Sequence, residues 1–124
     1  MKLTFLGTGT SKGIPEIGCS CPTCMSTDPR DKRLRVSVLI ETDDARILID
    51  CGPDFRTQML GIPFDRLDGV LLTHEHYDHF SPGDIRKVMK DDTKMIVPAS
   101  MLDVVKEKVY KTTRFTFMQP TVSQ

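Results

Sequence analysis

The sequence carries no net charge and no long apolar run, and each absence excludes a class of function. Its 17 basic side chains equal its 17 acidic ones, so no overall field would attract nucleic acid or an anionic membrane. The apolar stretch near the N-terminus is broken by glycine at position 7, which is too early for a signal peptide or a membrane span. We therefore expect a cytoplasmic protein without a membrane partner, and the charge argues against a nucleic-acid partner.

Disulfide bonds are not expected either, because the cytosol keeps thiols reduced. Three of the four cysteines are crowded into CSCPTC, as Cys19, Cys21 and Cys24. This C-x-C-x-x-C spacing on a proline-containing loop allows three thiolates to converge on one tetrahedral zinc ion; free or redox-active thiols are the alternative. The fourth cysteine, Cys51, is interpreted as a small buried apolar residue.

The pattern of apolar residues predicts an α/β fold for this domain-sized chain of 124 residues. Short strands are predicted at 2–6, 35–42, 45–50, 68–74, 94–98 and 114–118, and the second and third form a hairpin. Helices are predicted at 52–60 and from Ser81 and Ser100 onward. Leu60, at the end of the first helix, is expected in the core, and 7–29 is predicted to be a loop.

All three histidines of the chain lie in LLTHEHYDH, directly after a predicted buried strand. His74 and His76 can face one metal ion, and Asp78 and His79 can turn toward a second. Imidazole nitrogen and carboxylate oxygen suit zinc, manganese or iron, and two such ions can polarise a phosphoryl group and generate hydroxide. The alternative, histidines exposed in a polar turn, is disfavoured because all three fall within six positions.

Three stretches carry a resemblance to a known family. THEHYDH resembles the His-x-His-x-Asp-His signature of the metallo-β-lactamase fold superfamily, and ILIDCGPDF is similar to its upstream strand, whose aspartate matches Asp50. The opening MKLTFLGTGTSKGIPEIGCSCPTC resembles the phosphodiesterase branch, which includes the cyclic-phosphate phosphodiesterase of phosphonate breakdown. The resemblance covers about residues 1 to 80.

The resemblance implies a site and a fold. Zinc or manganese, up to two ions, would be held by His74, His76, Asp78 and His79. Asp50 would not touch the metal but would accept a hydrogen bond from one of these ligands. Metal-bound hydroxide would attack the phosphorus of a small or cyclic phosphodiester, and Asp78 would help to orient it. The implied fold is one half of an αββα sandwich, a mixed sheet with helices on one face, formed by residues 1–124 as a single half-domain.

The resemblance also implies parts that this sequence lacks. The family completes its two-metal site with a later histidine, a bridging aspartate and a final histidine, and no histidine follows His79. The family fold has two halves and about twice this length. After residue 80, HFSPGDIRKVMKDDTKMIVP looks more like a lactonase-like branch. We therefore expect a fragment, a hybrid gene or an engineered chain in preference to a contiguous enzyme.

Three functions remain open. The first is an incomplete phosphodiesterase unit. The second is a catalytically silent metal-binding half-domain that pairs with a second copy or with a complementary half-domain. The third is RNA processing of the ribonuclease Z type. The zero net charge and the lack of a clear RNA-binding insertion argue against it.

Two further stretches lie outside the histidine cluster: the cysteine cluster and a glycine-rich stretch. For the cysteine cluster the family uses a distant C-terminal histidine as fourth ligand, so Cys51, water or another chain would have to replace it. GTGTSKG matches neither the dinucleotide fingerprint nor the phosphate-binding P-loop and is predicted to be a tight turn beside the metal site.

Overall fold

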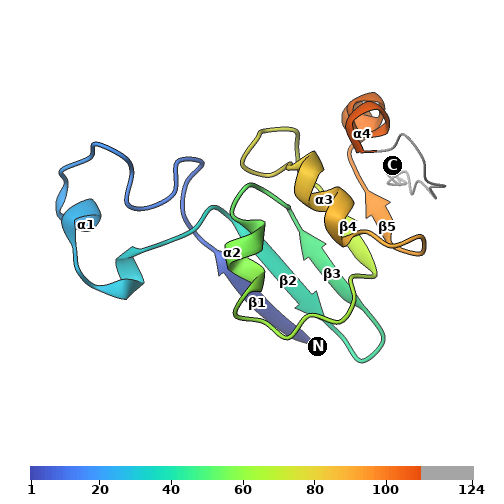
Figure 1. The fold of residues 1–124 in the computed structure, drawn as a ribbon, viewed down its shortest axis with the longest axis horizontal. Coiled ribbons are helices and arrows are strands. Elements are labelled where there is room, and N and C mark those ends of the chain that lie inside the picture. Colours follow the sequence, from blue (N-terminus) through green and yellow to red (C-terminus); the bar gives the residue numbers. More distant parts are fainter. Residues whose placement is uncertain (110–124) are drawn as a thin grey trace, which may run out of the picture.

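The computed structural model describes residues 1–109 of the chain, so the strand predicted at 114–118 lies outside the described residues. The fold is built on one five-stranded sheet with strand order β1-β2-β3-β4-β5 (Figure 1). The strands are β1 Lys2–Gly7, β2 Ser37–Glu41, β3 Arg46–Ile49, β4 Gly69–Leu71 and β5 Lys94–Ile96. Within the described residues, each strand expected from the sequence is present, and the chain follows the sheet from one edge to the other.

The sheet is mixed. β1, β2 and β3 pair antiparallel, whereas β3, β4 and β5 pair parallel. The expected hairpin joins β2 to β3, and Thr42 closes it by donating its N–H to the carbonyl of Ala45 at 2.8 Å. Because β3 and β4 run parallel, their carboxyl ends meet at one edge of the sheet, which is where such folds place functional loops.

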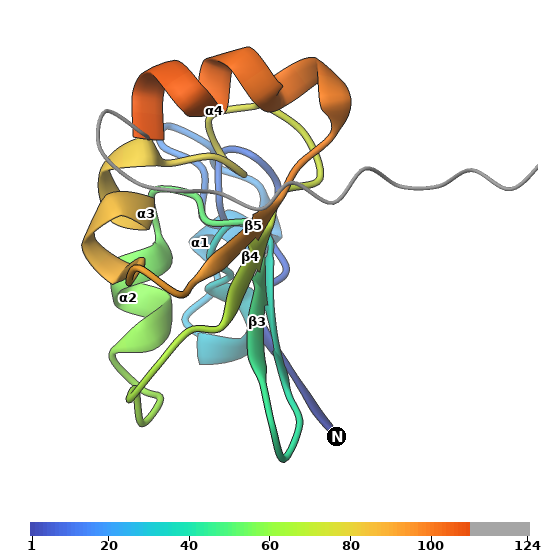
Figure 2. The same cartoon turned by 90° about the vertical axis from the view of Figure 1, so that its right-hand side faces the viewer.

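Residues 1–109 also form four α-helices and two short 3-10 helices, of which the last two follow β5. They are α1 Pro22–Met25, η1 Pro29–Asp31, α2 Phe55–Met59, α3 Pro82–Val88, η2 Ala99–Met101 and α4 Leu102–Val109. The helices α2 and α3 lie together on one side of the sheet (Figure 2). The predicted fold class, a mixed sheet with helices on one face, is confirmed. No helix of residues 1–109 combines the length and the apolar character that a membrane crossing requires.

Residues 8–34 leave the sheet as an extended arm that contains α1 and η1 (Figure 1). The sequence predicted a loop here, because proline, glycine and cysteine dominate the composition. Two short helices form nevertheless, since Pro22 and Pro29 each occupy a first helical turn, where the missing N–H costs nothing. Asp28 also caps η1 by accepting the N–H of Arg30 at 2.9 Å.

The core lies between the sheet and the helices α2 and α3. Alternate residues of neighbouring strands stand in one row on this face, where Leu39 is paired with Leu48 and Leu48 with Val70. These three side chains are completely buried, and Phe55 of α2 and Ile85 of α3 pack against the same cluster. Burial of each large apolar side chain stabilises the fold by about 1.5–3 kcal/mol.

The opposite face of the sheet is also apolar but is far less covered. Its central row pairs Phe5 with Val38, Val38 with Ile49, Ile49 with Leu71 and Leu71 with Ile96, and so crosses all five strands. Phe5 is 67% exposed, and no helix of the described part covers this row (Figure 2). Strands that are apolar on both faces are typical of a sheet with a layer on each side.

Candidate metal centres

The histidine loop, residues 72–81, follows β4 and lies against the chain that leaves β3. Cys51 donates its N–H to the carbonyl of His79 at 2.8 Å, and Ser81 donates its N–H to the carbonyl of Cys51 at 2.6 Å. These backbone bonds extend the parallel pairing by a short bridge between Cys51 and Phe80. The loop is therefore held by the sheet, as its position after a buried strand predicted.

Asp50, the first residue after β3, is the anchor of the histidine loop. Its side chain accepts hydrogen bonds from the N–H of Thr73 at 2.8 Å, from the Thr73 hydroxyl at 2.8 Å and from Nδ1 of His79 at 2.7 Å. It is only 3% exposed and has a φ of 59°, a left-handed conformation that aspartate tolerates better than most residues. Asp50 is therefore a buried carboxylate that accepts from His79, and its role as the acceptor that supports a metal ligand stays a prediction.

The bond to Asp50 determines which nitrogen of His79 is free. A carboxylate only accepts, so Nδ1 of His79 donates and the lone pair of a neutral ring lies on Nε2. That Nε2 faces Oδ2 of Asp78 at 3.2 Å, and Asp78 is only 4% exposed. An imidazolium would donate its Nε2–H to this carboxylate, whereas a neutral ring and the carboxylate would both direct lone pairs at a cation between them. Two ligands of one tetrahedral zinc ion are about 3.3 Å apart, so Asp78 and His79 fit a shared divalent ion.

The other two histidines complete the cluster. The ring of His74 lies 4.0 Å from that of His79 and 4.7 Å from that of His76, measured between centroids. The hydroxyl of Thr73 also lies 2.9 Å from Nδ1 of His74. The structure thus brings the three predicted histidines together. The division of these ligands between two ions stays a prediction, because the ring of His74 neighbours both other rings.

Gly52 and Thr73 belong to this site, although sequence reasoning did not single them out. A Cβ atom on Gly52 would stand 1.9 Å from the backbone oxygen of Asp78, so only glycine lets the chain after β3 pass so close to the histidine loop. Thr73 links Asp50 to the first histidine. Gly52 directly follows Asp50-Cys51 and Thr73 directly precedes His74, and this adjacency is the feature of the sequence that could have identified them.

The cysteine cluster lies on the arm, away from the sheet. The sulfur atoms of Cys19, Cys21 and Cys24 all lie within 4.8 Å of one another, and among the described residues no three donors of the histidine loop are so closely gathered. α1 separates Cys21 from Cys24 by one turn. The three predicted ligands therefore converge, as zinc binding requires.

Hydrogen bonds make the cysteine sulfurs unequal. The backbone of Cys24, followed by the thiol of Cys19, hydrogen-bonds to Cys21 and lowers its pKa. The N–H of Glu16 donates to the sulfur of Cys24 at 3.4 Å and acts to lower its pKa, but the other two thiols and burial together raise it. Cys21 thus becomes a thiolate, the form that binds metal and reacts, more readily than Cys24.

The fourth ligand suggested for this cluster, Cys51, is excluded. It is completely buried at the end of β3 and stands apart from the three clustered sulfurs. Burial, helped by the nearby Asp84 and Asp50, raises the pKa of its thiol far above the usual range. Cys51 is thus a small buried apolar residue, as its alternative interpretation from the sequence held. Water or another chain remains as the candidate fourth ligand of a zinc ion at the cysteine cluster.

The glycine-rich stretch GTGTSKG lies beside the histidine loop, as predicted. Tyr77, which stands between His76 and Asp78, donates its hydroxyl to the carbonyl of Ser11 at 2.7 Å. This contact joins residues that are far apart in the sequence. The stretch is therefore a neighbour of the candidate metal site and not an isolated turn.

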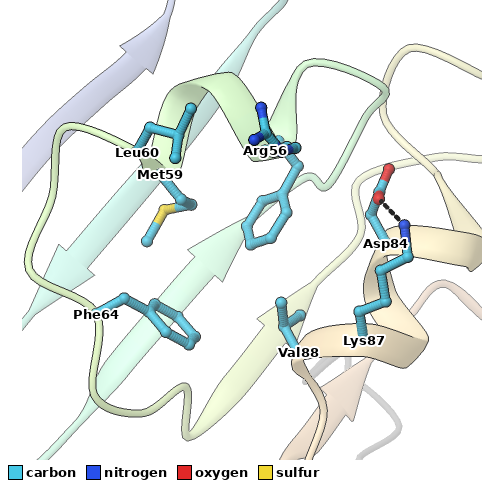
Figure 3. Close-up of a pocket in the computed structure, with 8 residues that line it drawn as sticks. Arg56, Met59, Leu60, Phe64, Asp84, Lys87 and Val88 are labelled. Atoms are coloured by element: carbon cyan, nitrogen blue, oxygen red, sulfur yellow. Dashed lines mark hydrogen bonds and ion pairs between the residues drawn. The ribbon is translucent and has the colours of Figure 1, made fainter.

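An apolar groove of about 280 Å³ lies between α2 and α3 (Figure 3). Phe55, Met59 and Val88 line it, and the ion pair of Asp84 and Lys87 lies at its rim. Leu60 also lines the groove and is 68% exposed, so the expectation that this residue belongs to the core is wrong. The groove has no histidine or cysteine in its lining and is separate from both candidate metal centres.

Comparison with known proteins agrees with this fold. The profile of the Beta-lactamase superfamily domain matches residues 45–120. An octanoyltransferase of Porphyromonas gingivalis is 47% identical over 113 residues, which cover 89% of this chain and 23% of that protein. A ribonuclease Z of Bradyrhizobium diazoefficiens is 40% identical over 79 residues, which cover 62% of this chain and 21% of that protein.

A solved diphosphatase of the PhnP family has the same fold. It superposes with a TM-score of 0.80 at 35% identity, over 94% of this chain and 50% of that one. The chain thus spans half of this solved structure and less than a quarter of the two curated relatives. The profile match runs continuously across residue 80, after which the sequence resembles a lactonase-like branch of the superfamily.

Proposed function

The chain belongs to the metallo-β-lactamase fold superfamily, and on that basis we propose that residues 1–124 form one half-domain of a metal-dependent phosphodiesterase. The family is one of hydrolases, and relatives of this chain are named as a diphosphatase and a ribonuclease Z. The observation that carries the proposal is the opposition of Nε2 of His79 to the buried carboxylate of Asp78 at 3.2 Å. The substrate class we propose is a small or cyclic phosphodiester.

The proposed ligands are His74 and His76 for one ion and Asp78 and His79 for a second, with zinc or manganese as the metal. Bound there, a divalent ion would act as a Lewis acid on the phosphoryl oxygen and lower the pKa of water. Asp50 holds the Nδ1 proton of His79 and so keeps Nε2 directed at the site. Asp78 would accept a hydrogen bond from the attacking water and orient it toward phosphorus.

The half-domain is proposed to act with a second unit. No histidine follows His79 in the sequence, so further nitrogen ligands would come from outside residues 1–124. The uncovered apolar row that runs from Phe5 to Ile96 supports a partner that packs a second sheet on it. A complementary half-domain would supply the remaining ligands, whereas a second copy would supply only another histidine loop.

Ribonuclease Z-like RNA processing is the second candidate, favoured by the 40% identity to the Bradyrhizobium protein. The balanced charge of this chain weakens it, because RNA binding is dominated by basic surfaces. The cysteine cluster is proposed to hold a structural zinc ion with water or another chain as fourth ligand. A rise in titratable thiols after chelation would support that zinc ion, and an unchanged count would exclude it.

The test is a chromogenic phosphodiester assay with added zinc or manganese, beside His76→Ala and a chelated sample, with bound metal measured in each. Turnover by the wild type that disappears in both controls is the expected result. Metal binding without turnover would leave the silent half-domain as the function of the isolated chain. Loss of neither metal nor turnover in His76→Ala would overturn the assignment of the site.

A further inference from the structure

The backbone carbonyl of Ser11 accepts hydrogen bonds from two side chains that are distant in the sequence. Tyr77 donates its hydroxyl at 2.7 Å, and Arg35 donates Nε at 2.8 Å. Ser11 lies in the stretch 7–13, which we call the glycine loop. One backbone atom thus joins the glycine loop, the segment just before β2 and the histidine loop.

Arg35 is itself held in place by α2. Its Nη1 donates to Oδ1 of Asp54 at 2.8 Å, its backbone N–H donates to Oδ2 at 2.9 Å, and its carbonyl accepts from Gln58 at 2.7 Å. The guanidinium also lies 5.8 Å from the centre of the Tyr77 ring, within the range of a cation–π contact. The planar fork of arginine makes these contacts together, which lysine cannot reproduce.

Tyr77 gains little from packing, because 59% of it is exposed. It is held by its hydrogen bond to Ser11 and by the contact of its ring with the Arg35 guanidinium. Since Tyr77 stands directly between His76 and Asp78, this bond sets the distance between the glycine loop and two proposed metal ligands. The glycine loop carries exposed hydroxyl groups on Thr8, Thr10 and Ser11, which suit hydrogen bonding to a polar group of a substrate.

We propose that Arg35 and Tyr77 are positioning residues that hold the glycine loop as a wall of the metal site. The wall contacts the part of the phosphodiester that does not react, so the two residues govern substrate affinity more than the chemical step. Only the contact of the glycine loop with substrate rests on the proposed function. The clamp itself, Tyr77 and Arg35 on the carbonyl of Ser11, can be tested without turnover.

The first experiment measures amide hydrogen exchange of residues 8–13 in Tyr77→Phe and Arg35→Lys. Loss of one such hydrogen bond should speed exchange in the glycine loop about 5-fold in each variant, without faster exchange in the core strands. Arg56→Lys is the matched control, because Arg56 is an exposed arginine of α2 outside the clamp. Unchanged exchange in the glycine loop of both variants would overturn the clamp.

The second experiment measures kcat and KM for a chromogenic phosphodiester in the same three variants, with metal content verified. We expect KM to rise about 5-fold in Tyr77→Phe and Arg35→Lys at nearly constant kcat, since the lost contact is made equally in ground and transition states. Faster exchange with an unchanged KM would overturn the role of the loop as a substrate wall. Absence of turnover in the wild type would count against the proposed function, while the exchange data would still decide the clamp.

Discussion

The histidine loop and the cysteine cluster are both short, donor-rich segments, but they are built in different ways. The cysteine cluster gathers three sulfurs from six consecutive residues of an arm that lies outside the sheet. The histidine loop depends on Asp50 and Gly52, which reach it from another strand through the parallel pairing of β3 and β4. One site follows from local spacing, and the other exists only when the sheet is folded.

This difference implies that the two sites should respond to different substitutions. A change in the sheet edge should damage the histidine loop and leave the cysteine cluster intact. A change in the arm should do the reverse. The following experiments change one region at a time.

Gly52→Ala should have the largest effect. Its Cβ would stand 1.9 Å from the oxygen of Asp78, so we expect the free energy of unfolding to fall by about 3 kcal/mol. Gly83→Ala in α3 is the control, because no heavy atom lies within 4 Å of its Cβ position, and it should be neutral or stabilising by about 0.5–1 kcal/mol. Urea denaturation followed by circular dichroism measures both. Equal stabilities of the two variants would contradict the close approach.

Asp50→Asn should have the next largest effect. Asparagine tolerates the left-handed φ but removes the charge that pairs with Nδ1 of His79, so we expect metal affinity at the histidine loop to fall about 10–100-fold. Zinc at the cysteine cluster should stay bound. Calorimetric titration with manganese measures the first site, and Asp65→Asn, an exposed carboxylate, is the control. Unchanged affinity would remove Asp50 from the site.

Cys21→Ser should abolish zinc at the cysteine cluster with little effect on the sheet. In the metal-free protein the free energy of unfolding should change by less than about 0.5 kcal/mol, because Cys21 is exposed on the arm. Zinc content and urea denaturation provide the two readings. A large loss of stability in the sheet would show that the two regions are coupled.

The smallest effect concerns the reactivity of the thiols in the metal-free protein. The lowered pKa of Cys21 gives it more thiolate at neutral pH than Cys24 has, so Cys21 should be alkylated before Cys24. Cys24, whose pKa is raised, should follow, and the buried Cys51 should react only on unfolding. Mass spectrometry of timed iodoacetamide reactions gives the order. Early modification of Cys51 would contradict its burial.

The same contrast explains how much the sequence could predict. The histidines and the three clustered cysteines were found because their chemistry is encoded in local spacing, and the strands because their apolar pattern is local too. Gly52 and the contact of Tyr77 with Ser11 were missed, since they arise from the approach of distant segments. Cys51 was suggested as a zinc ligand because sequence alone cannot tell how far it stands from the cluster.

Two other errors have local causes. The short helices α1 and η1 formed inside a predicted loop because proline, which marks loops in general, also starts helices. Leu60 was expected in the core from its residue type, but the helix α2 ends at Met59 and leaves Leu60 outside. A residue's type predicts burial less well where an element ends.

The central claim is that His79, oriented by Asp50 and opposed to Asp78, is a metal ligand. Titration with manganese(II), followed by electron paramagnetic resonance, tests it most directly. This hard ion prefers oxygen ligands such as the carboxylate of Asp78 and avoids the thiolates of the cysteine cluster. We predict that the wild type and Cys21→Ser bind manganese alike and that His79→Ala loses most of this binding. Equal binding by His79→Ala and the wild type, with both proteins folded, would contradict the account.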